Sequence, residues 1–422
     1  MGEARALNKV VAGGAAVCLL VVGCGDAADD EGVTLRFAWW GNEHRHEITQ
    51  EIIDIYEQEN PHVSIETEYG GSFEDHWDRL ATQVAGGDAP DVIQMDEQYL
   101  REYADRGALH SLDEVDVSEF SETAVANGRV EDELLAVTLG LNAPTVLANV
   151  DVFQSAGVDV PDDDTWTWED FADVAAEISE GSDDVWGSAG PLGIAPFQVW
   201  LRQSGAHLAT DEGELGFAVA EAQAYFEYFK DLLDAEVLPP AAVIQEDRAA
   251  PEEQTLSGTG REALATRWTN QAVGSAQASG ASLELLRYPG RSDSDDDPLW
   301  LKSSMYLSVP ATTDHPQEAQ QFIDFFVNSE DAARIAQVER GVPPNMAVRE
   351  LVVDDLDDLD AETVDFIEQL EAEEAEPEPL APVGSSDFQP TVDRYLMEVF
   401  FDRLSPEQAA EDLVAELEGQ LG

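Results

Sequence analysis

Apolar and polar residues alternate at the start of the chain's body, over 33–37, which predicts a strand. Apolar residues then recur on one helical face over 48–56 and alternate again over 63–67. A second helical run covers 73–84, and a short apolar strand follows at 92–95. The order strand, helix, strand, helix, strand predicts a parallel sheet with right-handed crossovers.

A second α/β block is predicted from about Asn142 onward. Thr167 to Asp170 has the form of a capping box and starts a helix that runs toward Ile178. The remaining patterns predict strands at 261–268, 283–288 and 305–309 and helices at 218–234, 316–328, 330–338 and 392–403, with a last helix after Ser405-Pro406. The chain of 422 residues is too long for one hydrophobic core, so two lobes are expected.

An apolar run, Val10 to Val22, follows two basic residues and ends just before Cys24. A charged start, an apolar middle and a small residue before the cut are typical of an export signal. The run is shorter than the ~20 apolar residues that span a bilayer. The pattern resembles the lipobox of bacterial lipoproteins, so we predict a signal peptide at 1–23, lipidation of Cys24 at the extracellular face of the cytoplasmic membrane, and an acidic tether at 24–32. An uncleaved leader that happens to contain a cysteine is the alternative.

Acidic residues dominate the composition, with 89 Asp plus Glu against 21 Lys plus Arg and a formal net charge of -68. This balance excludes nucleic acid as a partner, because its phosphates would be repelled. Such a charge costs self-repulsion unless salt screens it, so we interpret it as a halophilic adaptation; solubility alone is the alternative. Cys18 and Cys24 are the only cysteines, so the mature body has no pair of thiols for a disulfide or a Cys-type zinc site.

Two loops are candidates for chemistry, because ligands bind at the carboxyl ends of strands in an open parallel sheet. Trp39-Trp40-Gly41-Asn42 ends the first predicted strand and Gln94-Met95-Asp96 ends the third, so both open onto the same crevice. An exposed tryptophan there is costly without a ligand to cover it, and we expect Trp40 at the site. Asp96 precedes a helical pattern, so it is a candidate ligand-binding residue, a helix N-cap, or both.

Several motifs follow one another along the body of the chain. They are the segments 35–41 and 51–66, Gly86 to Val92 with the pattern G-x-x-P-D-[VI], Gly140-Leu141-Asn142 followed by Asn149 to Phe153, Trp166 to Phe171, Gly341-Val342-Pro343, and Ser405 to Leu417. Their order and spacing cover nearly all of the mature chain. Together they resemble the extracellular solute-binding proteins, the sugar-binding lipoproteins of ABC importers that are similar to maltose-binding protein.

The resemblance implies the α/β, two-lobed periplasmic-binding-protein type II fold, in which each lobe is a mixed sheet flanked by helices and the ligand lies in the cleft between the lobes. It implies a first lobe at 33–141 plus 263–311 and a second lobe at 142–262 plus 312–422. Carried over by position, the ligand-binding residues are Trp40, Asn42, Asp96, Asn142 at the hinge, Phe197, Trp200, Trp268 and Phe388. We expect Trp40, Asp96, Trp200 and Trp268 to face one gap.

The resemblance also implies a monomer that captures a carbohydrate outside the cell and delivers it to a membrane permease driven by a separate ATPase. No cofactor, no metal and no enzymatic activity are expected, because the sequence has no G-x-S-x-G, no H-E-x-x-H and no phosphate-cradling loop followed by Lys-Ser or Lys-Thr. The side chains agree with this chemistry, because aromatic rings cover the apolar face of a pyranose while Asp and Asn bond to its hydroxyls. Since the chain offers little positive charge, a neutral ligand is expected.

Alternatives stay open at the level of sequence. Another polar solute, such as a polyol, a glycerol phosphodiester or a cation, would suit a protein of the same family. Paired carboxylates would serve a secreted glycoside hydrolase, although acids are so frequent here that pairs arise by chance. A surface scaffold is a third reading. His44-Arg45-His46 has the spacing of a metal site, but such a stretch is more often a solvated turn.

Overall fold

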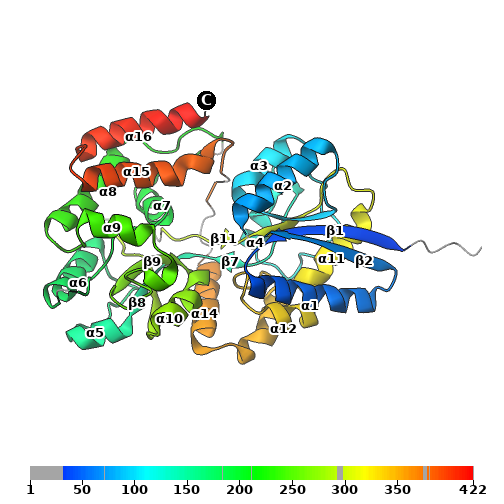
Figure 1. Ribbon diagram of the computed structural model, residues 1–422, viewed down its shortest axis with the longest axis horizontal. Helices are drawn as coiled ribbons and strands as arrows, with labels where there is room; N and C mark the ends of the chain where they lie inside the picture. The colour runs from blue at the N-terminus through cyan, green and yellow to red at the C-terminus, as the bar shows by residue number, and fades with distance from the viewer. Residues whose placement is uncertain are drawn as a thin grey trace, which may run out of the picture.

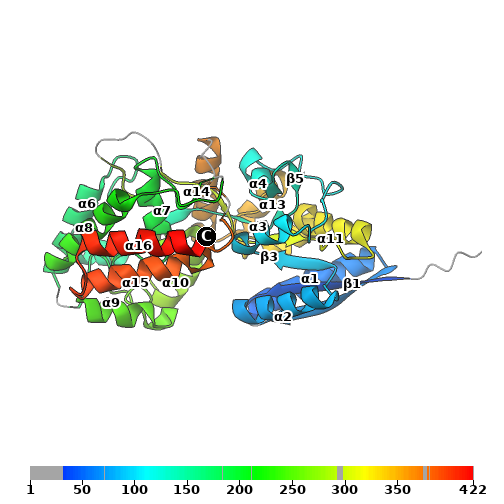
Figure 2. The same cartoon turned by 90° about the horizontal axis from the view of Figure 1, so that it is seen from above.

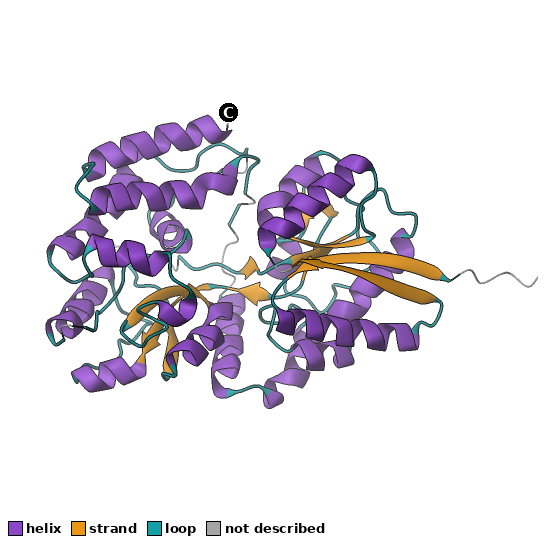
Figure 3. Cartoon of the chain, in the orientation of Figure 1, coloured by secondary structure: helices purple, strands orange, loops and turns teal. Residues whose placement is uncertain are grey.

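The computed structural model describes residues 32–70, 72–182, 184–210, 212–291, 298–373, 378–379 and 381–421. The predicted signal peptide, Cys24 and all of the tether except Gly32 lie outside these residues. The described chain forms two α/β lobes side by side, joined through their middle by extended segments (Figure 1). Helices cover the outside of both lobes and the strands lie within them (Figure 3). The two-lobed α/β fold class predicted from the sequence is confirmed.

The first lobe is built on a five-stranded sheet with the order β2-β1-β3-β12-β6. Strand β1 runs parallel to β2 and β3, whereas β12 runs antiparallel to β3 and β6. Its elements are β1 (Val33–Trp40), α1 (Glu43–Glu59), β2 (Val63–Gly70), α2 (Phe73–Gly86), β3 (Val92–Met95), α3 (Glu97–Asp105), α4 (Glu122–Ala126), β4 (Arg129–Val130), β5 (Glu133–Leu134), β6 (Val137–Thr138), β12 (Tyr306–Ser308), α11 (Pro316–Asn328), α12 (Glu330–Ala336) and α13 (Met346–Val352). The parallel part is the strand and helix alternation that the sequence predicts.

The second lobe is built on a three-stranded antiparallel sheet with the order β10-β8-β9. Its elements are β8 (Pro144–Asn149), α5 (Val150–Ala156), α6 (Trp168–Glu180), α7 (Ala195–Arg202), α8 (Val219–Asp234), α9 (Ala241–Arg248), η1 (Glu252–Gln254), β9 (Leu264–Trp268), η2 (Thr269–Gln271), α10 (Ala272–Ser279), β10 (Leu283–Leu286), α14 (Asp358–Ala372), η4 (Ser385–Asp387), α15 (Phe388–Phe400) and α16 (Pro406–Leu421). None of the helices in the described part of the chain combines the length and apolar character that a membrane span requires.

The predicted division between the lobes is wrong for two segments. Strands β9 and β10 both pair with β8, so the described residues of 263–301 lie in the second lobe rather than the first. Helix α11 lies in the first lobe instead, where Phe322 packs edge-on against Phe37 of β1 with ring centroids 5.4 Å apart. The physical reason is that strand and helix patterns are local, whereas the sheet that a strand joins is decided by distant partners.

Local signals set several helix ends as predicted. The Thr167 hydroxyl accepts from the Asp170 backbone N–H and the Asp170 carboxylate accepts from the Thr167 N–H, so the capping box that begins α6 is confirmed. Asn60, just before Pro61, ends α1. Gly87 adopts φ 70° where α2 ends, a conformation that costs glycine little and other residues more.

In the described part of the chain, three segments cross between the lobes, which lie on either side of them when seen from above (Figure 2). The first two are β7 (Leu141–Asn142) and β11 (Lys302–Ser303), which pair antiparallel. The third runs from α13 through η3 (Val353–Asp355) to α14. The buried Arg349 guanidinium on α13 bonds to both carboxylate oxygens of Glu371 on α14, at 2.6 and 3.3 Å, so an ion pair ties this third crossing to both lobes.

Glu262 is a buried acid in the second lobe whose titration should be visible in stability. Its carboxylate accepts from the Ala189 N–H at 2.7 Å, and burial raises the pKa of Glu262 to about 7. The folded protein therefore holds this proton between the ordinary glutamate pKa and about 7, so stability falls as pH rises through that window, by about 3 kcal/mol in total. Chemical unfolding from pH 4 to 8 should show a steeper fall for the wild type than for Glu262→Gln, which keeps an oxygen for Ala189. Parallel pH profiles for the two proteins would contradict this prediction.

Candidate functional site

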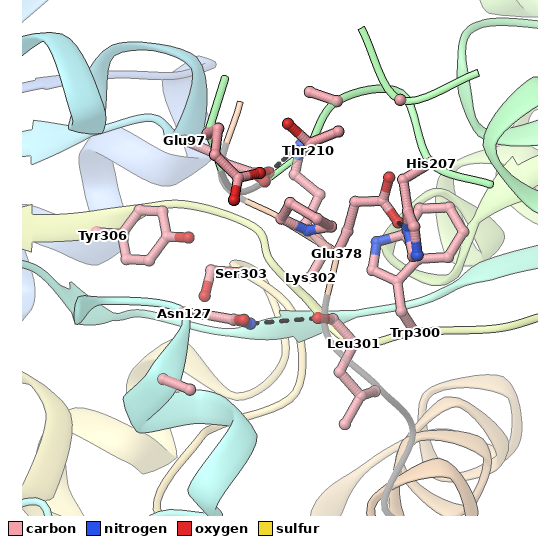
Figure 4. Close-up of a pocket in the computed structure, with 15 residues that line it drawn as sticks. Glu97, Asn127, His207, Thr210, Trp300, Leu301, Lys302, Ser303, Tyr306 and Glu378 are labelled. Atoms are coloured by element: carbon pink, nitrogen blue, oxygen red, sulfur yellow. Dashed lines mark hydrogen bonds and ion pairs between the residues drawn. The ribbon is translucent and has the colours of Figure 1, made fainter. Parts of the chain in front are cut away.

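Two adjoining cavities lie between the lobes beside the crossing strands. The floor cavity, of about 530 Å³, is lined by Tyr306 and Asn127 of the first lobe and His207 of the second (Figure 4). The wall cavity, of about 560 Å³, is lined by Asp96 and Phe73 of the first lobe and by Phe388 of the second. Both cavities share a set of lining residues, Glu97, Ala209, Trp300, Lys302, Glu378 and Pro379. Since each cavity draws side chains from both lobes, together they form the interlobe cleft.

Lys302 on β11 is the cation at the centre of this cleft. Its Nζ lies 3.1 Å from Glu97 Oε2 at the start of α3, a contact drawn in Figure 4. Burial alone would lower the pKa of Lys302, but the charges of Glu97 and Asp96 outweigh it and raise that pKa. Burial also raises the pKa of the neighbouring Asp96 carboxyl, against the opposing charge of Lys302. The cleft therefore holds an acid–lysine cluster with hydrogen-bonding groups for a polar ligand.

Two tryptophans stand beside Lys302. The Trp300 and Trp268 rings meet edge to face, with centroids 5.8 Å apart, and Lys302 Nζ lies 5.4 Å from the Trp268 ring centroid. Arg202 lies over Trp300 at 5.3 Å and pairs with Glu378 at 2.9 Å. These contacts hold Trp300 at the cavity wall, so flat aromatic surface and charged groups converge on one part of the cleft.

Comparison with known proteins identifies the family. A profile of bacterial extracellular solute-binding proteins matches residues 51–359. The chain belongs to this family. An uncharacterized lipoprotein in the oleD 5' region of Streptomyces antibioticus is 30% identical over 179 residues, which are 39% of this chain and 38% of that protein.

Solved structures of the same fold extend over nearly the whole chain. An extracellular solute-binding protein family 1 of Alicyclobacillus acidocaldarius is 25% identical with a TM-score of 0.76, covering 92% of this chain and 98% of that one. A periplasmic oligogalacturonide-binding protein of Yersinia enterocolitica, in complex with saturated digalacturonic acid, is 21% identical with a TM-score of 0.77 and the same coverage. An ABC substrate-binding protein of Listeria monocytogenes in complex with cycloalternan is 19% identical, with a TM-score of 0.76, again over 92% and 98%. The fold of these solute-binding proteins therefore extends over nearly the whole of this chain.

Several residues predicted for the binding site lie at or next to the cleft of this solute-binding protein. Asp96 and Phe388 line the wall cavity, and Asp96 also caps α3 by accepting from the Gln98 N–H at 3.1 Å. Trp268 contacts Trp300 and Lys302, as described above. Trp40 packs edge-on against Phe73, which itself lines the wall cavity.

Asn142 lies at the crossing strands, opposite Lys302 in the β7–β11 ladder. Its side chain is buried, and its amide oxygen has no hydrogen-bond partner among the described residues. This oxygen lies against Gly341, where an added Cβ would be 2.8 Å away, and Asn142 lines neither of the two cleft cavities.

Three predicted site residues are placed elsewhere. Phe197 is 0% exposed and packs against Phe217 in the core of the second lobe, and Trp200 is 8% exposed and packs against Trp168. Both point inward because residues three apart share one face of α7, so Gln198 lines the wall cavity in their place. Asn42 caps α1 by accepting from the Arg45 N–H at 2.9 Å. The expectation that Trp200 shares one gap with Trp40, Asp96 and Trp268 is therefore wrong.

The cleft residues that sequence reasoning missed are Trp300, Lys302 and Glu378. A signal was present for Lys302, because it is one of only two lysines after residue 24 and lies three residues before the strand predicted at 305–309. The His44-Arg45-His46 stretch is structural instead. His46 is buried and its Nδ1 accepts from the Trp39 indole N–H at 2.9 Å. In the part of the chain that the structure describes, no group of three or more metal-binding side chains is gathered.

Proposed function

We propose that this solute-binding protein captures a carbohydrate. The observation that carries the proposal is that Trp300 and the Asp96–Glu97–Lys302 cluster line the interlobe cleft, with Trp268 beside it in contact with Trp300 and Lys302. Aromatic rings offer a surface for the apolar face of a sugar ring, and carboxylates and an ammonium group bond to its hydroxyls. The sugar complexes of the same fold, with digalacturonic acid and cycloalternan, support the proposal.

Closure of the lobes would link binding to transport. A ligand that contacts both lobes stabilises the closed form, and the three crossing segments are the hinge about which the lobes move. Lipidation at Cys24 would hold the monomeric receptor at the outer face of the cytoplasmic membrane. The closed protein would then dock on the membrane subunits of an ABC importer, whose ATPase is a separate chain.

Replacing Trp268 with alanine is expected to weaken sugar binding at least tenfold, about 1.4 kcal/mol, while the protein stays folded. The reason is the loss of an aromatic surface that lies between Trp300 and Lys302. Titration calorimetry with the wild type and the variant measures the effect. Trp200→Phe is the matched control, because Trp200 lies in the core; it should change the affinity less than about twofold. Unchanged binding by Trp268→Ala would contradict the assignment.

A ligand screen tests the proposal as a whole. Thermal shifts with a panel of neutral and acidic mono- and oligosaccharides, recorded in molar salt, should show stabilisation by at least one saccharide. A panel of polyols and glycerol phosphodiesters tests the nearest alternative, and chromogenic glycosides test for hydrolysis. Stabilisation by saccharide without turnover supports the receptor, whereas turnover or a response to polyols alone would refute it.

A further inference from the structure

A third cavity, of about 710 Å³, lies in the second lobe beside Trp268 and has an unusual balance of charge. We call it the arginine pocket. It adjoins the wall cavity, since Gln389 and Pro390 line both. Its lining includes four arginines, Arg248, Arg267, Arg394 and Arg403, but only two acids, Asp393 and Glu398. Across the whole chain acids outnumber bases by 89 to 21, so this pocket inverts the ratio of the protein.

Three of the four arginines are already paired with carboxylates. These pairs are Arg248 with Asp393 at 2.7 Å, Arg394 with Glu416 at 2.6 Å, and Arg403 with Glu398 at 2.9 Å. Arg394 and Arg403 are also largely exposed, so they form the rim of the pocket. Arg267 is the fourth arginine, and it is not part of any of these three ion pairs.

Arg267 on β9 is buried and incompletely satisfied. Its side chain is 4% exposed, and its Nε–H has no acceptor among the described residues. Its Nη1 donates to the Thr266 carbonyl at 2.9 Å, but the carboxylate of Glu252 is 3.9 Å from Nη2, beyond hydrogen-bond distance. A buried cationic donor without an acceptor costs more than a neutral one, and an anionic acceptor would remove that cost.

Tyr288 places a second unsatisfied group in the same pocket. The residue is 3% exposed, and its hydroxyl has no hydrogen-bond partner among the described residues. Burial raises the pKa of Tyr288, against Thr266 and the charge of Arg267, which lower it, so the hydroxyl keeps its proton at neutral pH and can donate it. Arg267 and Tyr288 thus line one cavity with two buried donors that lack acceptors, beside the tryptophan of the proposed sugar site.

We propose that the arginine pocket binds the carboxylate of an acidic sugar, with Arg267 and Tyr288 as its donors and Trp268 against the sugar ring. This inference rests on the proposed carbohydrate function and names the substrate class as uronate-containing saccharides. A carboxylate suits the pocket better than a phosphate dianion, because three of the four arginines are already paired with carboxylates and the charge of Arg267 is opposed by Asp247, Glu252 and Glu262. This proposal replaces the neutral ligand expected from composition, because four of the 21 Lys and Arg residues line one pocket beside the cleft.

Calorimetry with matched sugars tests the proposal on the full mature chain. The probes are galacturonate and glucuronate mono- and disaccharides, each paired with its methyl ester, which keeps the ring and removes the charge. At least one free acid should bind about tenfold or more tightly than its ester. Arg267→Gln should abolish that preference, and Arg106→Gln, an exposed arginine on the first lobe, should preserve it. Tyr288→Phe keeps the ring packing and should weaken acid binding more than ester binding, which protects the test if Arg267→Gln fails to fold.

The outcomes separate this inference from the function on which it rests. Equal binding of acid and ester, or binding of neutral sugars alone, would overturn the acidic-sugar proposal and leave the carbohydrate receptor intact. A response to no saccharide, acidic or neutral, would overturn both. A preference for the acid that survives in Arg267→Gln and Tyr288→Phe would show that the carboxylate binds elsewhere and would overturn the assignment to this pocket.

Discussion

Replacing Gly140 with alanine is expected to lower the free energy of unfolding by about 3 kcal/mol, because the added methyl group has no room. A Cβ at this position would lie 2.1 Å from the carbonyl oxygen of Arg340, which is backbone and cannot swing aside. The two segments are locked together by paired hydrogen bonds, from Leu141 N–H to Val342 O at 2.8 Å and from Val342 N–H to Leu141 O at 3.0 Å. The substitution must therefore spread the chain at the point where the lobes are joined.

Urea unfolding of Gly140→Ala and wild type in molar salt measures this effect. Gly419→Ala is the matched control, because Gly419 lies within α16 and an added Cβ there meets nothing within 4 Å. Alanine in a helix interior should leave stability unchanged or raise it by about 0.5–1 kcal/mol. If the two variants unfolded at the same denaturant concentration, close packing at the crossing would not be the reason for glycine at position 140.

The hinge also shows how much the sequence can reveal. Gly140-Leu141-Asn142 and Gly341-Val342-Pro343 were each recognisable as motifs, although nothing local says that they touch. The structure joins them through the Leu141–Val342 bridge. Strands and helices can be predicted because periodicity and capping residues act over a few positions. A bridge over 201 residues has no such local signal, because it depends on the whole fold.

The predicted division between the lobes was wrong because local patterns do not show which distant segment a strand pairs with. The strand patterns at 261–268 and 283–288 are correct, yet a strand pattern is the same whichever sheet it joins. The pairing of β9 and β10 with β8 decides the matter, and it buries Leu264 and Leu286 against the second lobe. Periodic polarity therefore predicts which residues are buried but not which core receives them.

The binding site was predictable where it follows the carboxyl ends of strands and less so elsewhere. Asp96 follows β3, and both its cleft position and its capping role could be read from the pattern. Phe197 and Trp200 lie on a short helix, in which neighbouring positions point in different directions. One position can therefore face the core while the next faces the cleft. Gln198, one position along, lines the cavity instead. Lys302 lies on a two-residue strand, which is too short to show any periodicity.

Lowering the salt concentration is expected to destabilise the protein by several kcal/mol, because its net charge of -68 is then poorly screened. Two like charges 10 Å apart in water repel by about 0.4 kcal/mol before screening. The Debye length falls from ~10 Å at 0.1 M salt to ~3 Å at 1 M, so high salt removes most of that repulsion. Tens of such pairs, each relieved by the greater separation of charges in the unfolded chain, add up to the expected effect.

Thermal melting in potassium chloride from 0.05 to 2 M tests this prediction, with sucrose as the control for exclusion of solute from the protein surface. The melting temperature should rise steeply with salt and little with sucrose.

A variant with less negative charge can be made at the exposed acids beside α14. Asp354, Asp355 and Asp358 lie next to Asp360, whose pKa burial and the charge of Asp357 raise to about 6. Changing the three exposed acids to Asn should raise the melting temperature in low salt and leave it nearly unchanged at 2 M. Equal melting temperatures of the wild type in dilute and molar salt would show that self-repulsion does not govern the stability of this protein, and its acidity would then reflect solubility alone.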